Sequence, residues 1–393
     1  MRAPSYTAVW TFRSLSLPEW DSKGRALCSV HIVLDWDGTL TVKDTMALLG
    51  GLPRARDLRL YNQRLHRPES EPPSHLRGEA EVNSIVDLTP PASVNLWDGF
   101  VAAYMEDYRA HKALHYPVTP KESPREERAS PDQYSRWLES LKVVEYASAE
   151  RVTRSRFFRG VRTEDVANVA RDALDSGALQ LREDWNCLFD MSVSQAGDQQ
   201  APLISKISII SVNWSECFIR WSLYLAAERL TNISPASKAA LLGRIDNMKI
   251  SSNEIHGLDS PQGSSGKLTG NVRTAREKAE RLPEFSNQSE AAAAKQQHRE
   301  AAFVVYVGDS GTDYECFRGA DLPIWISDQG EEENRRVRRF EAVFRPLNTG
   351  NESGGFKSCH LKEWAELTDR GDGDWCAWAD DLKEVADWLK SVS

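Results

Sequence analysis

The sequence lacks the features that mark membrane-spanning, disulfide-stabilised and nucleic-acid-binding proteins. No apolar run approaches the roughly 20 residues that a membrane-spanning helix needs, so we expect no membrane role. The chain carries a net charge of −9 and has no long uninterrupted block of Lys and Arg, which argues against a nucleic-acid partner. With 393 residues and 40% hydrophobic content, it is long enough for one large domain or two.

The cysteines and the N-terminus point to the cytoplasm. The sequence contains no Cys-x-x-Cys pair and no zinc-ligand spacing, so we expect reduced, mostly buried thiols. The six cysteines are Cys28, Cys187, Cys217, Cys316, Cys359 and Cys376. Residues 1–27 lack the apolar core of a secretory signal. Three arginines stand there among serines and threonines, and although Glu19 and Asp21 interrupt them, a mitochondrial presequence stays open as an alternative.

The most informative segment is an apolar run, residues 30–34, that ends in Asp35, Trp36, Asp37 and Gly38. In a strand, side chains two residues apart share a face. Asp35 and Asp37 would therefore repel each other unless a cation or a reacting phosphate lies between them. Gly38 allows a sharp turn and a close approach of the backbone to a ligand. The alternative is an ordinary polar turn after a strand.

A second segment repeats this design far downstream. The apolar run at residues 303–307 is followed by Gly308, Asp309 and Asp313. The carboxyl ends of neighbouring parallel strands form the crevice in which ligands bind, so the two acidic segments can converge there. A cluster of aspartates of this kind suits Mg²⁺, which prefers oxygen ligands and keeps several waters.

Together the two segments resemble the first and fourth motifs of the haloacid dehalogenase superfamily of phosphohydrolases. The motifs read Asp-Trp-Asp-Gly-Thr at residues 35–39 and Gly-Asp-Ser-Gly-Thr-Asp at residues 308–313. The resemblance implies a Rossmann-like three-layer α/β/α core with a parallel sheet. It also implies a Ser or Thr that ends a strand and a Lys on a later helix, both between these motifs.

Ser211 matches the expected hydroxyl residue. It closes the apolar run at residues 207–210 and precedes a helical pattern at residues 216–230. We therefore predict that Ser211 binds phosphate. Ser215, which directly precedes the helix, fits a helix N-cap better.

Three lysines lie between Ser211 and the last motif, namely Lys249, Lys267 and Lys278. The sequences Ser-Asn-Glu-Ile at residues 252–255 and Gly-Lys-Leu-Thr-Gly at residues 266–270 resemble the phosphoserine-phosphatase-like branch of the superfamily. The order of elements in that branch selects Lys278, which lies in a plausible helix. The short spacing after the glycine turn leaves Lys267 open as the alternative.

The resemblance also implies roles for the aspartates. Asp35 would attack phosphorus and form an aspartyl-phosphate. Asp37 would protonate the leaving oxygen and later deprotonate the attacking water. Mg²⁺ would be bound by Asp35, Asp309 and the backbone carbonyl of Asp37.

The remaining site residues would bind phosphate or support those that do. Ser211 and Lys278 would hold the phosphate oxygens, and Thr39 and Asn213 are further phosphate-binding candidates. Asp313 would hold Lys278 or a metal-bound water.

The long interval between the first motif and Ser211 indicates an inserted module. Loops within α/β units usually have two to six residues, so these residues must form structure of their own. We predict a core at residues 28–50 and 201–393 and a mostly helical cap at residues 51–200. In the resembled branch such a cap closes over the site. Four arginines in the insertion could reach an anionic substrate or could form a solvated face, namely Arg154, Arg156, Arg159 and Arg162.

Helical spacing and apolar runs predict further elements. Helices are expected at residues 44–49, 97–115, 134–146, from 163 onward, 274–282, 314–319 and 374–390. Final strands are expected at residues 322–326 and 342–344. Residues 67–74 read as an exposed loop, and residues 284–299 as an exposed helix or a flexible excursion.

These observations predict a Mg²⁺-dependent phosphatase that acts on a small phosphorylated metabolite. Phosphoserine-like, phosphocholine-like and sugar phosphates all remain open, because fold and reaction class do not fix the substrate. Two alternatives stay open: a phosphomutase with the same phospho-aspartate chemistry, and a catalytically silent interaction protein. The sequence does not indicate the oligomeric state.

Overall fold

The computed structural model describes most of the chain between residues 30 and 391. The described ranges are 30–65, 92–116, 131–190, 204–284, 302–327, 332–344, 356–366 and 374–391. The predicted loop at 67–74, nearly all of the segment at 284–299 and the N-terminal residues 1–29 lie outside them. None of the described helices combines the length and the apolar character that crossing a membrane requires.

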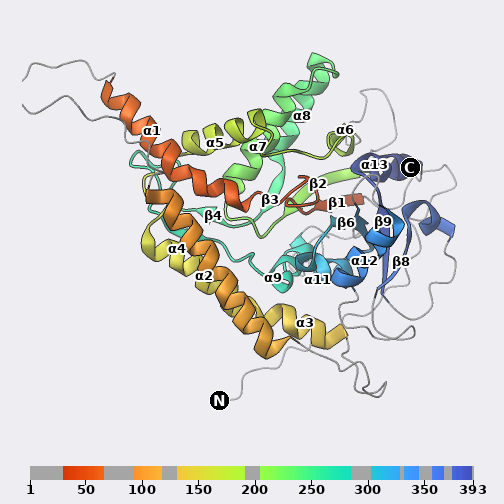
Figure 1. Cartoon of the computed structure of the whole chain (residues 1–393). Helices are drawn as coiled ribbons and strands as arrows, with labels where there is room; N and C mark the ends of the chain where they lie inside the picture. Colours follow the sequence, from red (N-terminus) through yellow and green to blue (C-terminus); the bar gives the residue numbers. More distant parts are fainter. Residues whose placement is uncertain are drawn as a thin grey trace, which may run out of the picture.

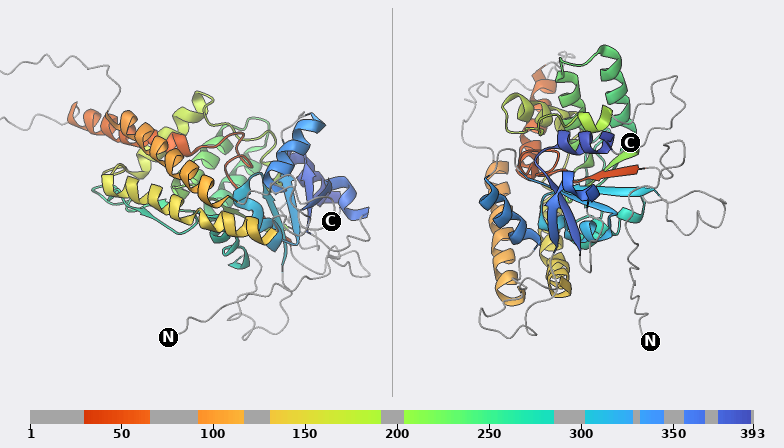
Figure 2. Two further views of the ribbon diagram at one scale, coloured as in Figure 1. Left: turned by 60° about the horizontal axis from the view of Figure 1, so that its bottom comes forward. Right: turned by 90° about the vertical axis from the view of Figure 1, so that its right-hand side faces the viewer.

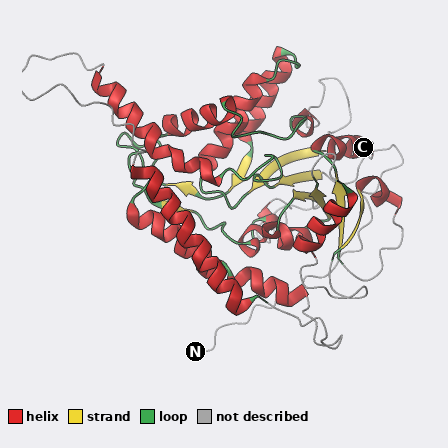
Figure 3. Cartoon of the chain, in the orientation of Figure 1, coloured by secondary structure: helices red, strands yellow, loops and turns green. Residues whose placement is uncertain are grey.

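The centre of the fold is a seven-stranded sheet, shown in yellow in Figure 3. Its order is β3-β2-β1-β6-β7-β9-β8, and every neighbouring pair is parallel. The sheet strands are β1 (Val30–Leu34), β2 (Ile204–Ile210), β3 (Lys249–Ser251), β6 (Phe303–Gly308), β7 (Leu322–Ile326), β8 (Lys357–His360) and β9 (Trp375–Ala379). A separate antiparallel pair consists of β4 (Glu254–Ile255) and β5 (Leu268–Thr269).

Helices surround this sheet (Figure 1). Those between β1 and β2 are α1 (Leu52–Leu65), α2 (Ala92–His115), α3 (Pro131–Ser140), α4 (Lys142–Ser155), α5 (Thr163–Asp175) and α6 (Cys187–Asp190). Those after β2 are α7 (Glu216–Arg229), α8 (Pro235–Asn247), α9 (Ala275–Ala279), α11 (Tyr314–Gly319), α12 (Glu333–Phe344) and α13 (Leu382–Ser391). Short 3₁₀ turns are η1 (Met46–Gly51), η3 (Leu282–Glu284), η4 (Gly311–Asp313) and η5 (Leu361–Glu366).

Side chains of alternate strand residues divide the core into two apolar clusters. On β6, Val305 and Val307 belong to the cluster that contains Val385 of α13, together with residues of α7 and α8. Tyr306, which points to the opposite face, belongs to the cluster that contains Phe317 of α11, together with residues of α9 and α12. Because successive strand residues point to opposite faces, one run of buried residues supplies both clusters. The sheet therefore lies between two helical layers, and the predicted three-layer α/β/α architecture is confirmed.

The helices α1–α6 interrupt the chain between two neighbouring strands, β1 and β2. Figures 1 and 2 show α2, α3 and α4 together to one side of the sheet, while α5 packs on α7. Tyr146 of α4 donates to Glu277 of α9 at 2.7 Å, so the inserted helices are fastened to the core. The described part of this segment, residues 51–65, 92–116 and 131–190, is mostly helical. The domain boundaries at 50/51 and 200/201 remain a prediction.

Four expected elements differ from the structure. The single helix expected at residues 134–146 is divided between α3 and α4, which are separated at Leu141. Residues 342–344 belong to helix α12 and form no strand. The prediction failed because a run of three apolar residues fits a helix as well as a strand. Residues 374–390 form strand β9 followed by helix α13, not one helix. The helix expected at 44–49 is the 3₁₀ turn η1, which continues into α1.

Candidate active site

The ends of β1 and β6 bring together the two acidic segments predicted from the sequence. These strands are parallel neighbours in which Leu34 lies opposite Val307. The backbone N–H of Asp35 extends the ladder by donating to the carbonyl of Val307 at 2.9 Å. Asp35 and Asp309 therefore leave the same edge of the sheet. Between β1 and β6 the order of winding reverses, which is where parallel sheets bind ligands.

A tight turn holds the residues that follow Asp35. The carbonyl of Trp36 accepts from the N–H of Leu40 at 3.0 Å, and the buried Trp36 indole donates to Thr45 Oγ1 at 2.9 Å. Gly38 adopts φ +79°, and a Cβ built at this position would lie 2.2 Å from Oδ2 of Asp309. Glycine is therefore required both for the backbone conformation and for the close approach of Asp309.

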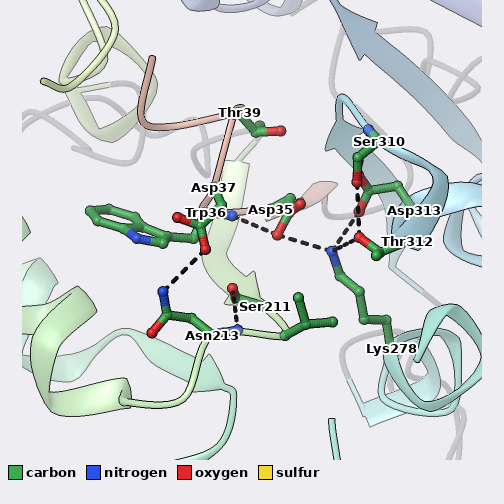
Figure 4. A network of polar contacts seen from close by, with 12 residues as sticks. Asp35, Trp36, Asp37, Thr39, Ser211, Asn213, Lys278, Ser310, Thr312 and Asp313 are labelled. Atoms are coloured by element: carbon green, nitrogen blue, oxygen red, sulfur yellow. Dashed lines mark hydrogen bonds and ion pairs between the residues drawn. The ribbon is translucent and has the colours of Figure 1, made fainter. Parts of the chain in front are cut away.

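Lys278 lies at the centre of the site, between two carboxylates (Figure 4). Its helix, α9, begins at the N-cap Thr274, whose side chain accepts from the backbone of Glu277. The fully buried Lys278 Nζ lies 2.9 Å from Asp35 Oδ1 and 2.6 Å from Asp313 Oδ1. Burial by itself would lower the pKa of Lys278, but the charges of Asp313 and Asp35 outweigh burial and raise it. The ammonium group therefore stays charged.

The other two lysines lie elsewhere. Lys267 is exposed and belongs to the glycine-rich turn before β5. Lys249, on β3, forms an ion pair with Glu284 at 2.6 Å and is half-exposed. Of the three candidates, the structure brings only Lys278 into contact with Asp35.

Asp313 fixes Lys278 and organises the loop after β6. Its Oδ1 accepts from Lys278 and, at 2.6 Å, from the hydroxyl of Tyr306. Its Oδ2 accepts from the backbone N–H groups of Asp309 at 3.1 Å and Ser310 at 3.0 Å. Burial would raise the pKa of Asp313, but Lys278 and these hydrogen bonds outweigh burial and lower it. Both oxygens of this ionised carboxylate are therefore committed to protein partners.

Asp37 has a separate set of partners. Its Oδ1 accepts from the backbone N–H and the hydroxyl of Thr45, at 2.7 and 2.6 Å. Its Oδ2 accepts from the amide of Asn213 at 3.1 Å (Figure 4). Burial raises the pKa of Asp37 to about 6, and the nearby charge of Asp44 acts in the same direction. A carboxyl group in this range can both donate and accept a proton near neutral pH.

Ser211 and Thr39 complete the set of predicted residues. Ser211 is fully buried just beyond the end of β2, and its Oγ accepts from the N–H of Asn213 at 3.1 Å. The Thr39 hydroxyl donates to Asp309 Oδ1 at 3.0 Å. Ser215 accepts from the N–H of Phe218 and caps α7, which confirms that reading. Asn213 contacts Asp37, so in this structure it orients a carboxyl group.

The Asn-Glu step at residues 253–254 joins the loops around the site. The amide of the buried Asn253 donates to the carbonyls of Asn213 at 3.1 Å and Val272 at 2.7 Å. Glu254 accepts from the Ser215 hydroxyl at 2.9 Å and from the Cys217 N–H at 2.7 Å, at the start of α7. These bonds tie the loop after β2 to the segment that leads to α9.

The donor set fits a divalent cation. Carboxylate oxygens of Asp35, Asp309 and Asp313 lie within 4.8 Å of one another. Burial raises the pKa of Asp309 to about 7, and the charge of Asp313 adds to the shift. Burial and Asp313 also raise the pKa of Asp35 well above its ordinary value. Because Asp313 is committed to Lys278, the carboxylates of Asp35 and Asp309 are the ones that suit a hard cation such as Mg²⁺.

Sequence reasoning missed three residues that support the site: Thr45, Tyr306 and Arg182. Thr45 binds Asp37, Tyr306 binds Asp313, and Arg182 binds the carbonyl of Gly38. The apolar run that contains Tyr306 was visible in the sequence, but its hydroxyl contact was not. Arg182 lies 144 residues from Gly38, and no local pattern indicates that contact.

The four arginines of the insertion take other partners. Arg154 pairs with Glu150 at 2.8 Å, and Arg162 donates to the carbonyl of Pro261. Arg156 and Arg159 are exposed, and their backbones pack against the loop at residues 263–266. None of the described contacts of these arginines involves the residues around Asp35 and Lys278.

A partly buried polar pair links two inserted helices. Tyr104 of α2 donates to Glu145 of α4 at 2.8 Å. Burial raises the pKa of Glu145 to about 7, while Tyr104 and the charge of Arg273 oppose the shift. The charge of Asp44, which acts on Asp37, also raises the pKa of Tyr104, after burial and the Glu145 charge.

We expect Glu145→Gln to change how stability depends on pH. The pKa of Glu145 rises from 4.5 to about 7 on folding, so between these values the folded state binds the proton more tightly than the unfolded state. Its contribution to stability therefore falls as pH rises through this window, by up to about 3 kcal/mol. Urea unfolding at pH 4.5 and pH 8 measures this effect. Relative to the wild type, the free energy of unfolding of Glu145→Gln should be higher at pH 8 than at pH 4.5. Glu150→Gln, at an exposed position of the same helix, should differ from the wild type by the same free energy of unfolding at both pH values. An equal pH dependence in both variants would contradict the prediction.

Comparison with known proteins adds only a distant likeness. No protein-family model matches the sequence, and no curated protein matches it. Among solved structures, the chain is similar to a phospho-aspartyl intermediate analogue of phosphoserine phosphatase, with 12% identity, TM-score 0.36, and coverage of 92% of this chain and 99% of the other. A HAD family hydrolase from Salmonella enterica serovar Typhi matches with 9% identity, TM-score 0.34, and coverage of 86% and 71%. A probable phosphoserine phosphatase from Vibrio cholerae matches with 15% identity, TM-score 0.34, and coverage of 79% and 58%. At these scores the likeness carries no argument about activity, which must come from the site itself.

Proposed function

We propose that the protein is a Mg²⁺-dependent phosphohydrolase that cleaves a small phosphorylated metabolite through an aspartyl-phosphate. The observation that carries this proposal is the buried Lys278 between Asp35 and Asp313, together with a third carboxyl group, Asp37, which follows Asp35 by two residues and has a pKa of about 6. A nucleophile, a fixed positive charge and a proton carrier thus lie together at the carboxyl end of a parallel sheet.

The chemistry proceeds in two displacements. In the first, a carboxylate oxygen of Asp35 forms a bond to phosphorus while the bond from phosphorus to the ester oxygen breaks. Asp37 gives its proton to that leaving oxygen. In the second, a water oxygen bonds to phosphorus, the bond to Asp35 breaks, and Asp37 takes the proton of the water. Asp35 is regenerated, and the products are an alcohol and inorganic phosphate.

The other residues stabilise charge during both steps. The ammonium of Lys278 and the hydroxyl of Ser211 would hold phosphate oxygens, where negative charge develops in the transition state. Mg²⁺, held by Asp35, Asp309 and the backbone carbonyl of Asp37, would offset the repulsion between nucleophile and phosphate. Thr39, which donates to Asp309, orients that carboxylate.

Removal of the metal and of the proton carrier tests this proposal. Phosphate release should vanish with EDTA and return with added Mg²⁺, across a panel of phosphoserine, phosphocholine, sugar phosphates and p-nitrophenyl phosphate. Asp37→Asn should lower kcat about 10² to 10⁴-fold, because its amide carries no transferable proton. Asp57→Asn, at an exposed carboxylate of α1, should retain wild-type kcat.

Two outcomes would redirect the proposal. Exchange of phosphate between substrates with little release would indicate a phosphomutase. No release and no exchange with any substrate would favour an interaction protein.

A further inference from the structure

The last part of the insertion pairs with the turn that follows Asp35. The N–H of Val42 donates to the carbonyl of Gln180 at 2.9 Å, and the N–H of Arg182 donates to the carbonyl of Leu40 at 2.9 Å. Between them, Thr41 and Leu181 form an antiparallel bridge. The returning chain therefore lies directly beside the turn at residues 36–41, and it places Arg182 there.

The side chain of Arg182 connects two loops at the edge of the sheet. Its Nη2 and Nε donate to the carbonyl of Gly38 at 2.7 and 3.2 Å. Its Nη1 donates to the carbonyl of Ser327, directly after β7, at 3.1 Å. The residue is only 8% exposed. A guanidinium group that is desolvated to this extent and bound to backbone carbonyls of two loops restrains both of them.

The loop that Arg182 holds carries groups to which the proposed function assigns the cation. The N–H of Gly38 donates to Thr41 Oγ1 at 3.2 Å, while its carbonyl accepts from Arg182. The peptides on both sides of Gly38 are therefore fixed, including the one that carries the carbonyl of Asp37. Asp309 lies against the Cα of Gly38, so a shift of this glycine would also move that carboxylate.

Arg182 also contributes charge. Its positive charge acts on Asp309 in the same direction as that of Lys278. Arg182 takes no part in the ion pairs that Lys278 makes with Asp35 and Asp313, because its described contacts are the carbonyls of Gly38 and Ser327.

We propose that Arg182 is a positioning residue, which fixes the turn at residues 36–41 so that Asp35, Asp309 and the Asp37 carbonyl can hold one divalent cation together. It acts through Gly38 and does not touch the substrate. The predicted effect on turnover rests on the proposed phosphatase function. The predicted effects on cation binding and on loop protection do not.

The experiment compares Arg182→Ala and Arg182→Lys with the wild-type full-length chain. Calorimetric titration with Mg²⁺, without substrate, should show binding weakened about tenfold or more in Arg182→Ala. Arg182→Lys should fall between the two, because lysine keeps the charge but loses the two-pronged bond to Gly38. Amide hydrogen exchange of residues 36–42 should accelerate in both variants. Arg171→Ala, an exposed arginine of α5 whose side chain donates to Asn168, is the matched control and should match the wild type.

Further readouts separate positioning from a general loss of stability. With p-nitrophenyl phosphate at saturating Mg²⁺, kcat should fall while KM changes less than about threefold. Millimolar guanidinium should restore part of the Mg²⁺ affinity of Arg182→Ala.

If Arg182→Ala does not fold, Arg182→Lys carries the test. Wild-type Mg²⁺ affinity and wild-type exchange in Arg182→Lys would overturn the proposal, as would a wild-type chain that binds no Mg²⁺. Loss of Mg²⁺ binding in Arg182→Ala, with no turnover by the wild type, would support Arg182 and overturn the phosphatase.

Discussion

Asp35→Asn should reduce Mg²⁺-dependent phosphate release at least about 10³-fold, because an amide cannot form the aspartyl-phosphate. The substitution keeps the size of the side chain and removes one buried negative charge. Lys278 keeps its 2.6 Å ion pair with Asp313, so the site retains its main internal bond. We therefore expect a folded, inactive protein. The measurement is phosphate release per enzyme, together with the thermal unfolding midpoint.

A trapping experiment tests the same residue without turnover. Beryllium fluoride, a mimic of a phosphorylated aspartate, should raise the unfolding temperature of the wild type in the presence of Mg²⁺ and leave Asp35→Asn unchanged. Glu284→Gln, at a partly exposed carboxylate on η3, should respond like the wild type. Turnover by Asp35→Asn within tenfold of the wild type would disprove the nucleophile assignment.

Lys278→Met should lower the free energy of unfolding by about 3–5 kcal/mol. The methionine fills a similar volume but leaves two buried carboxylates, Asp35 and Asp313, without their cation. Leaving buried charges unpaired is among the most destabilising changes a core can undergo. Urea unfolding in EDTA at pH 7 measures the difference, because added Mg²⁺ would partly replace the missing charge.

A matched lysine and a second substitution make this prediction specific. Lys267→Met, at the exposed alternative lysine, should change stability by less than about 0.5 kcal/mol. Adding Asp313→Asn to Lys278→Met should recover part of the loss, because it removes one of the unpaired charges. Equal stability losses for Lys267→Met and Lys278→Met would show that the ion pairs contribute little.

The sequence alone predicted the elements whose pattern is local and unambiguous. The apolar runs that stop before Asp35 and Asp309 predicted two strand ends, and the parallel sheet brings those ends together. The choice of Lys278 depended on the order of neighbouring motifs, and the structure brings that lysine to Asp35. Its role in catalysis remains a prediction.

The sequence predictions were wrong where the spacing of apolar residues fits both a strand and a helix. Trp378 in β9 lies four residues before Leu382 in α13, which is also the spacing of a helical stripe, so strand and helix merged into one expected helix. Pairing with β8 and β7 decides the matter in favour of a strand, and that information is not local. The support given by Arg182 to Gly38 was missed for the same reason.

The strand order has a consequence for the synthesis of the chain. β1 emerges from the ribosome early, yet its partner on one side, β6, is made only when Phe303–Gly308 has been translated. At ordinary translation rates this delay is on the order of tens of seconds. Throughout it, the apolar segment Val30–Leu34 lacks its β6 neighbour and keeps hydrogen-bonding groups free to pair with another chain. The nascent protein should therefore depend on chaperones until late in translation, when the pairing of β6 with β1 covers this segment and also brings Asp309 to Asp35.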